Sequence, residues 1–243
     1  MEKERITVEE LLRRYAAGDR DFANFDLSGI LLGRRYADEL IKRYQTEENT
    51  RIAGVNLRGI NLSDANLEGA NLEAVDFMGA NLSGANLNGA ILQVARLNEA
   101  NLSGANLREV ILSSARLHQT NLSGAILERA VSYDAKFIGT ILNRAKLRGA
   151  GLETSCFTGV DFTSADLREV YMGPATIKQC NFTKANWNRG NIYQCHFFDC
   201  NFTNISFSKA KMDGIRFVRC NFTNAKLTGI HPFEAGFEES VGL

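Results

Sequence analysis

The sequence predicts an all-β solenoid in which four five-residue units form each coil, and three observations support this fold. First, a large apolar residue occupies every fifth position from Ile52 to Leu227, and only Ser132 among these positions is polar. A period of five suits neither an α-helix, at 3.6, nor a strand, at 2. Second, a small residue, most often alanine, precedes each large residue by two places. Third, similar units recur at every fourth repeat.

The repeating unit has the form Ala-Asn-Leu-x-Gly, as in residues 80–84 and 100–104. In an extended segment the alanine and the leucine point to one side, and the asparagine between them points to the other. The last two residues then turn the chain, and glycine suits a turn that needs positive φ. We therefore expect the leucine and alanine positions to fill the interior and the asparagine position to face solvent.

The recurrence at every fourth repeat sets the size of a coil. It places Asn61, Asn81, Asn101 and Asn121 in one column, whereas recurrence at every third repeat would mix asparagine with aspartate and isoleucine. Four units per coil therefore divide the repeat between Ile52 and Leu227 into nine coils. We expect the asparagine column to form a hydrogen-bonded ladder, because such side chains bond readily to nearby turn groups.

This repeat resembles the pentapeptide-repeat family over residues 52–230. The resemblance implies a right-handed quadrilateral parallel β-helix of about nine coils with an N-terminal capping α-helix. Residues 9–22 are similar to the capping helix of cyanobacterial members, which implies a cyanobacterial source. Some members of the family mimic duplex DNA and bind gyrase, and others regulate cyanobacterial differentiation. The resemblance therefore implies a non-catalytic scaffold for protein–protein interaction, with gyrase binding as an alternative.

The repeat divides the chain into three segments. Residues 1–21 are predicted to form the capping helix, in which Thr7-x-x-Glu10 has capping-box spacing. Residues 22–230 are predicted to form the β-helix, and residues 231–243 a C-terminal cap or tail.

An insertion at residues 33–51 interrupts the repeat after a first partial coil. Within it Tyr36, Leu40 and Tyr44 follow helical spacing, so a short amphipathic helix is expected. Departures from a repeat often carry function, which makes these three residues candidates for binding a partner. The alternative is a second capping element laid against the rod.

One outward column contains Ile91, Ile111 and Val131. Three stacked β-branched residues on the outside predict an exposed apolar patch, and such patches mark partner sites. The alternative is that a flat parallel sheet favours β-branched residues for its own stability. Ser132 lies beside Val131, so a local distortion is expected there.

The adjacent column contains Arg96, Arg116 and Lys136. This basic ladder is a candidate contact for an acidic partner or for phosphates. The alternative is a solvated face balanced by nearby carboxylates such as Glu99.

The balance of charge argues against two classes of function. The chain has 28 Lys and Arg against 28 Asp and Glu. A zero net charge disfavours both nucleic-acid binding and DNA mimicry, because mimicry needs a dense acidic surface. We expect an unidentified protein partner, and either a monomer or a dimer formed through a coil end.

Catalysis finds little support in the sequence. His118, His196 and His231 lack metal-ligand spacing, and no phosphate-binding loop appears. We therefore expect no enzyme activity, no cofactor and no metal. The five cysteines are expected to be free thiols, and the lack of a leader or of a long apolar run leads us to expect a cytoplasmic protein without membrane contact.

Overall fold

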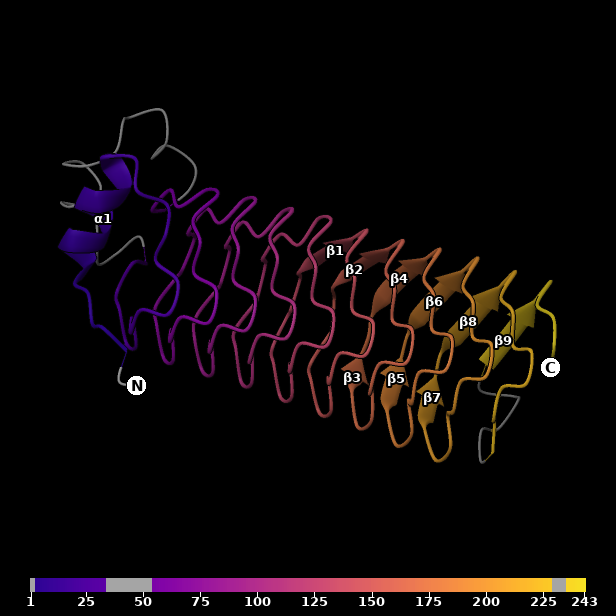
Figure 1. Cartoon of the computed structure of the whole chain (residues 1–243). Helices are drawn as coiled ribbons and strands as arrows, with labels where there is room; N and C mark the ends of the chain where they lie inside the picture. Colours follow the sequence, from indigo (N-terminus) through magenta and orange to yellow (C-terminus); the bar gives the residue numbers. More distant parts are fainter. Residues whose placement is uncertain (1–2, 34–53, 229–234) are drawn as a thin grey trace.

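The structure is a computed structural model that describes residues 3–33, 54–228 and 235–243. It is a rod of stacked coils with a helix at the N-terminal end and the C-terminus at the other end (Figure 1). Equivalent positions of successive coils pair in parallel, as in Asn81 with Asn101 and Asn86 with Asn106. The predicted parallel β-solenoid is therefore confirmed, and one coil spans four repeat units.

Longer strands form in the C-terminal half, where the parallel pairing between coils extends over several consecutive residues instead of a single one. One parallel sheet has the order β1-β2-β4-β6-β8-β9, and a second has the order β3-β5-β7 (Figure 1). The elements are α1 (Val8–Ala16), β1 (Lys136–Ile138), β2 (Cys156–Thr158), β3 (Tyr171–Met172), β4 (Ala175–Lys178), β5 (Asn191–Tyr193), β6 (Cys195–Phe198), β7 (Lys211–Asp213), β8 (Ile215–Val218) and β9 (Ala235–Glu238).

The rod has four faces, and we name each by its column of outward residues, which occupy equivalent positions of successive coils. Face 1 contains Asn81, face 2 contains Asn86, face 3 contains Ile91, and face 4 contains Arg96. The column of face 1 extends from Asp21 to Val241. The predicted count of nine coils was too low, because chain on both sides of residues 52–227 joins the stack.

The N-terminal start of the stack differs from the prediction. Asp21 pairs with Asn61 and Leu31 pairs with Asn71, so the chain between these partners is twice as long as an ordinary coil. Leu32 therefore lies beneath Leu72. Ile52, the first position of the nine predicted coils, is also apolar and in phase with the period, and it lies outside the described residues.

The C-terminal segment continues the solenoid. β9 pairs in parallel with β8, and Val241 pairs with Asn221. The Phe237 ring stacks on Phe217 with a centroid distance of 5.1 Å, so it covers the last aromatic layer. Residues 235–243, within the segment predicted as a cap or tail, are thus in register with the coil before them.

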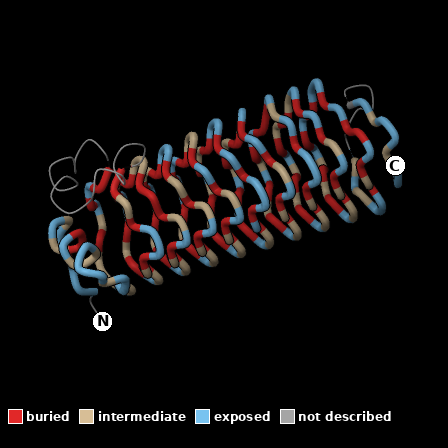
Figure 2. Tube along the Cα trace, turned by 90° about the horizontal axis from the view of Figure 1, so that it is seen from above, coloured by how far each residue is buried: buried red, intermediate tan, exposed pale blue. Residues whose placement is uncertain are grey.

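The core changes from leucine and alanine to aromatic residues along the rod. Figure 2 shows buried positions recurring around every coil. Phe162, Phe182 and Phe202 stack with centroid distances of 4.7 and 5.0 Å. Stacked rings at this distance gain favourable contact beyond simple burial of apolar area.

Small polar residues inside the rod donate to nearby backbone carbonyls. The Thr120 hydroxyl donates to Leu97 O at 2.7 Å. The Cys200 thiol donates to Phe198 O at 3.3 Å and is buried. Contact with the Cys180 thiol raises the pKa of Cys200 to about 12. Cys200 is therefore a protonated thiol, and Cys180 and Cys200 are both free and buried in the core.

α1 is shorter than the predicted segment 1–21, and it begins at the Thr7 cap that the sequence predicts. Thr7 Oγ1 accepts from Glu10 N at 3.2 Å, while the Glu10 carboxylate binds Arg13 at 2.7 Å. Leu11 and Leu12 are buried, so the apolar side of α1 covers the first coil. The Thr7 half of the predicted capping box is thus present.

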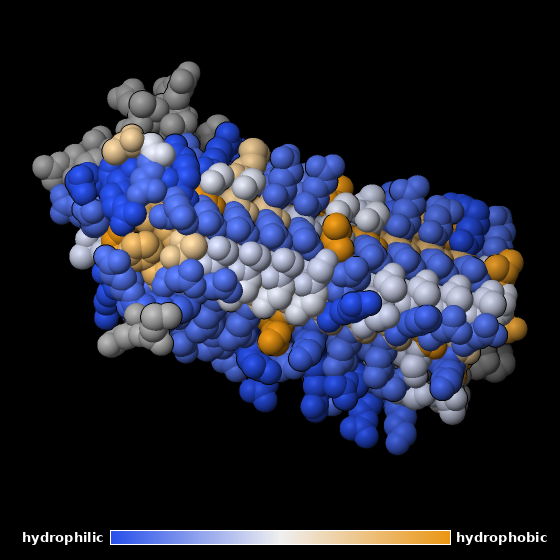
Figure 3. Space-filling model, in the orientation of Figure 1, coloured by the Kyte–Doolittle hydropathy of each residue, from blue (hydrophilic) through white to orange (hydrophobic). Residues whose placement is uncertain are grey.

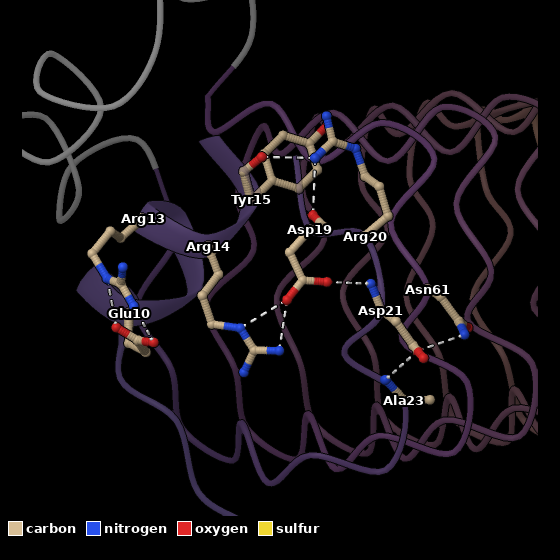
Figure 4. A network of polar contacts seen from close by, with 9 residues as sticks. All are labelled: Glu10, Arg13, Arg14, Tyr15, Asp19, Arg20, Asp21, Ala23 and Asn61. Atoms are coloured by element: carbon tan, nitrogen blue, oxygen red, sulfur yellow. Dashed lines mark hydrogen bonds and ion pairs between the residues drawn. The ribbon is translucent and has the colours of Figure 1, made fainter. Parts of the chain in front are cut away.

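A chain of contacts joins α1 to the first coils (Figure 4). The Arg14 guanidinium binds Asp19 at 2.6 Å, and Asp19 accepts from Asp21 N at 3.0 Å. That backbone hydrogen bond, followed by Arg14, lowers the pKa of Asp19. Asp21 in turn accepts from Asn61 Nδ2 at 2.9 Å. The asparagine ladder of face 1 therefore begins at the cap and continues through Asn81 at 3.0 Å.

The turns need positive φ more often than they have glycine. In most units the residue two places after the buried centre adopts φ near +60°, and at many of these positions it is not glycine. Val94 and Thr154 depart most from local preference, because a β-branched residue is poorly suited to this conformation. Hydrogen bonds such as Val94 N to Ser113 O at 2.9 Å hold these residues there.

Replacing Val94 with asparagine is expected to raise the free energy of unfolding by about 0.5–1 kcal/mol, because asparagine tolerates left-handed φ. Gly104→Val is the matched reverse change: no atom lies within 4 Å of an added Cβ there, so only backbone strain is introduced. It is expected to destabilise by about 1 kcal/mol. Urea denaturation measures both changes, and equal midpoints for the two variants would contradict this explanation.

Candidate functional site

The four faces differ in surface chemistry. Hydrophilic side chains form rows parallel to the long axis on the side shown in Figure 3, broken by isolated hydrophobic residues. On face 2, Arg108 binds Glu128 at 2.8 Å and Arg148 binds Glu169 at 3.0 Å. Face 1 is lined by the asparagine ladder. Faces 3 and 4 carry the residues that the sequence singles out.

Face 3 brings the predicted apolar residues together. Ile91 pairs with Ile111, and Ile111 pairs with Val131, so the three side chains lie on successive coils. Ile111 is 36 % exposed, and the other two are half-buried. The flat stack therefore presents apolar surface to solvent without any rearrangement.

Two tyrosines extend this apolar column, and of these the sequence analysis missed Tyr133. Tyr171 belongs to the same column beyond Gly151, and Tyr133 lies two positions after Val131. They are 50 % and 47 % exposed. Tyr133 occupies the position two residues after the outward one. Following that position from coil to coil, as was done for the outward one, would have found it. We define the face 3 patch as Ile91, Ile111, Val131, Tyr133 and Tyr171.

Ser132 alters its surroundings only slightly. Its backbone keeps the pairing between coils, because Ser132 N donates to Gly151 O at 2.9 Å. The following turn is looser, with 3.4 Å between Ala135 N and Ser132 O. The Ser155 hydroxyl donates to Ser132 O, and both serines are buried. The expected distortion is therefore limited to one turn, and the face 3 patch continues past it.

Only part of the basic ladder of face 4 is neutralised by ion pairs. Arg96 binds Asp76 at 3.3 Å, and Arg58 binds the same carboxylate at 2.8 Å. The balancing carboxylate is thus Asp76, one coil below, and not Glu99 as expected. Arg116 and Lys136 lie on adjacent coils, and neither forms an ion pair within the described residues. Two of the three ladder cations, Arg116 and Lys136, therefore lack an ion pair within the described residues.

The third predicted group lies outside the described residues. Tyr36, Leu40 and Tyr44 fall within the range 34–53. Their part in binding stays a prediction.

One surface hollow, of about 390 Å³, is lined by the paired charges of Arg108, Glu128, Arg148 and Glu169. No group of three or more His, Cys, Asp or Glu side chains is placed to hold a metal ion in the part of the chain that the structure describes. Within the same part, no helix has the length and apolar composition that a membrane span requires.

Comparisons with known proteins agree with this architecture. A family profile described as pentapeptide repeats matches eight copies over residues 56–93, 90–129, 115–153 and 133–169. A second, described as a pentapeptide repeat region, matches residues 172–241. A search of curated proteins finds no match.

Solved structures of similar proteins include two from the cyanobacterium Nostoc. HetL, a pentapeptide repeat protein involved in heterocyst differentiation regulation, is 25 % identical, with 97 % of this chain and 94 % of HetL covered and a TM-score of 0.34. The pentapeptide repeat protein alr5209 is 32 % identical over 54 % of this chain and 84 % of its own, with a TM-score of 0.26. The fluoroquinolone resistance protein QnrB1 is 15 % identical over 91 % of this chain and 92 % of its own, with a TM-score of 0.31.

Replacing Asp76 with asparagine is expected to lower the free energy of unfolding by about 2 kcal/mol. The carboxylate is only 4 % exposed and binds two arginines, so its loss leaves partly buried charges without a partner. Glu109→Gln is the control, because the Glu109–Arg129 pair is exposed and is worth less than about 0.5 kcal/mol. Denaturation curves compare the two, and equal losses would show that Asp76 has no special role.

Proposed function

This chain belongs to the pentapeptide-repeat family, and we propose that it is a non-catalytic scaffold that binds another protein through the face 3 patch. The observation that carries the proposal is the line of exposed apolar and aromatic side chains on one flat face. Partner surfaces of this kind depend on a small number of large anchors, among which tyrosine is common. Tyr133 and Tyr171 are such anchors.

The rigidity of the sheet favours binding. Ile111 N donates to Ala90 O at 3.0 Å, and Leu112 N donates to Val131 O at 2.7 Å. The patch therefore stands on a backbone that is hydrogen-bonded to the coils on both sides. A preformed surface loses little conformational entropy when a partner docks.

The distribution of charge supports a protein partner over gyrase binding by DNA mimicry. A DNA mimic needs a continuous acidic surface. Here Glu128 and Glu169 of face 2 are bound to arginines, and face 4 carries Arg116 and Lys136. These cations lie one face away from the patch, where they would draw in a partner with acidic residues at its rim.

We further propose a regulatory role in a cyanobacterial cytoplasm, with the scaffold acting by covering part of its partner. Binding alone then alters the partner's activity or its access to other proteins. The protein would work as a monomer or as a dimer joined through a coil end.

Capture of a partner from a cyanobacterial lysate tests the proposal. The double variant Ile111→Asn, Tyr171→Asn removes apolar surface, and asparagine already occupies outward positions such as Asn101. We expect at least tenfold less captured partner than with the unchanged protein, because anchor residues supply most of the binding energy. Quantitative mass spectrometry of the eluates provides the measurement.

Ile141→Asn is the matched control for this experiment. Ile141 is 38 % exposed, which is close to Ile111, but it lies on face 1. It should leave capture unchanged. Equal loss from both variants, or no loss from the double variant, would rule out the face 3 patch as the binding surface.

A further inference from the structure

The C-terminal half of face 4 is built from the parallel strands β1, β2, β4, β6 and β8, which lie side by side (Figure 1). Outward residues of successive strands form one row: Lys136, Cys156, Thr176 and His196. Residues two positions later form a second row: Ile138, Thr158, Lys178 and Phe198. Both rows stand on hydrogen-bonded strands, so the surface that they form is already in place before anything binds.

Two hollows in this sheet adjoin and form one shallow groove. One hollow, of about 440 Å³, is lined in part by Lys178 and Phe198. The other, of about 400 Å³, is lined in part by Cys156. Thr176 and His196 line both hollows, so the groove continues across β4 and β6. All of these side chains except that of Phe198 are exposed, so the groove is open to solvent.

The charge around the groove is positive. Arg116, Lys136 and Lys178 are exposed, and none of them forms an ion pair within the described residues. The one acidic side chain that lines the two hollows is Asp199. It is bound by Arg219 through hydrogen bonds of 2.7 and 3.0 Å. Three cations are therefore left to attract anionic groups from outside the chain.

The spread of these cations indicates the size of the occupant. Arg116 and Lys178 are three coils apart, which is about 14 Å at the usual spacing of strands. A single phosphate or carboxylate is too small to contact all three cations. A chain that carries several anionic groups along the axis of the rod can reach each of them.

The spacing of the coils favours a helix over an extended chain. An α-helix advances about 5.4 Å per turn, which is close to the coil spacing of about 4.8 Å. One acidic side chain per turn therefore lies opposite one coil after another. An extended chain directs a side chain to the same side only every 6.7 Å or about that, so its side chains fall out of step with the coils.

Apolar side chains accompany the cations. Ile138 is 36 % exposed, and the half-buried ring of Phe198 lines the first hollow. Both belong to the second row of the sheet, beside the row that contains Lys136. A helix that fits this surface thus has an acidic stripe with apolar side chains next to it.

We propose that the C-terminal half of face 4 binds an acidic amphipathic helix of a protein partner, lying parallel to the long axis of the rod. The carboxylates of this helix contact the three cations, and its apolar side chains enter the hollow beside Phe198. A helix laid into a groove is a common mode of peptide recognition. This surface is separate from the face 3 patch, so the inference goes beyond the proposed function and does not depend on it.

A model peptide tests this surface without the partner. The probe is a fluorescein-labelled, alanine-based helix of about 18 residues, with one glutamate per turn and leucines on the neighbouring stripe. Its control has glutamine in place of every glutamate. Fluorescence anisotropy with the full chain at low salt should show saturable binding of the glutamate peptide and about tenfold weaker binding of the glutamine peptide.

Substitutions locate the binding on face 4. The double variant Lys136→Gln, Lys178→Gln should bind the glutamate peptide about tenfold more weakly, because two exposed charge pairs are lost. Its matched control is Lys146→Gln, Lys226→Gln. These two lysines are exposed in the outward column of face 2, and the change in net charge is the same, so the affinity should stay within about twofold. Each variant's thermal midpoint shows whether the protein still folds.

No saturable binding, equal binding of the two peptides, or equal losses from the two double variants would overturn the inference. Tighter binding of a short DNA duplex than of the glutamate peptide would also overturn it, because face 4 would then be a general site for polyanions. The face 3 variant Ile111→Asn, Tyr171→Asn should bind the glutamate peptide as the unchanged protein does. Failure of the peptide to bind therefore leaves the proposed function of face 3 intact, and failure of that function leaves the peptide result unchanged.

Discussion

Hydrogen bonding between successive coils is the constraint on which the rest of the structure depends. Each outward residue donates to the coil before it and each buried centre donates to the coil after it, as in Asn101 N to Ala80 O at 2.9 Å and Leu82 N to Asn101 O at 2.7 Å. In the regular stack from Asn61 onward the two bonds stay in register because successive coils have the same length, and the longer connection between Asp21 and Asn61 still brings equivalent positions together. A single extra residue within a coil would exchange inward and outward positions. The five-residue period of the sequence follows from this requirement.

The same constraint directs the search for function to the outside of the rod. Inward positions must be apolar or small and are buried by their neighbours, so they have little freedom to vary. Outward positions stay aligned from coil to coil whichever residue occupies them, so their side chains are free to vary. Ladders of asparagine on face 1 and ion pairs on face 2 stabilise the rod itself. Face 3, with Ile111 and Tyr171, instead leaves large apolar side chains exposed.

The sequence predicted the core and the columns because both follow from periodicity. It placed Ile91, Ile111 and Val131 on one face, and the structure stacks them. That Leu32 lies beneath Leu72 could not be predicted from periodicity, because every apolar residue separated by a multiple of five is in phase. The positive φ at Val94 is set by the turn against the local preference of valine.

The details of the candidate site depend on side-chain conformations, which the position of a residue in its column does not determine. Asp76 lies one coil before Arg96 in the same column, so the coil period contained their pairing, although Glu99 is nearer in sequence. The approach of Tyr133 and Glu153 to Gly151 involves neighbours in two rows. Only the three-dimensional structure shows that the space over one glycine is shared by two polar atoms.

Deleting one coil tests the central constraint most directly. Removing residues 82–101 joins Asn81 to Leu102 and keeps every column in phase, whereas removing residues 82–100 shifts all later residues by one position. Circular dichroism with urea denaturation measures the outcome. We expect the in-phase deletion to keep the β-rich spectrum and a cooperative transition, and the shorter deletion to lose the transition. Equal stability of the two variants would contradict the account, because coil length would then not govern the fold.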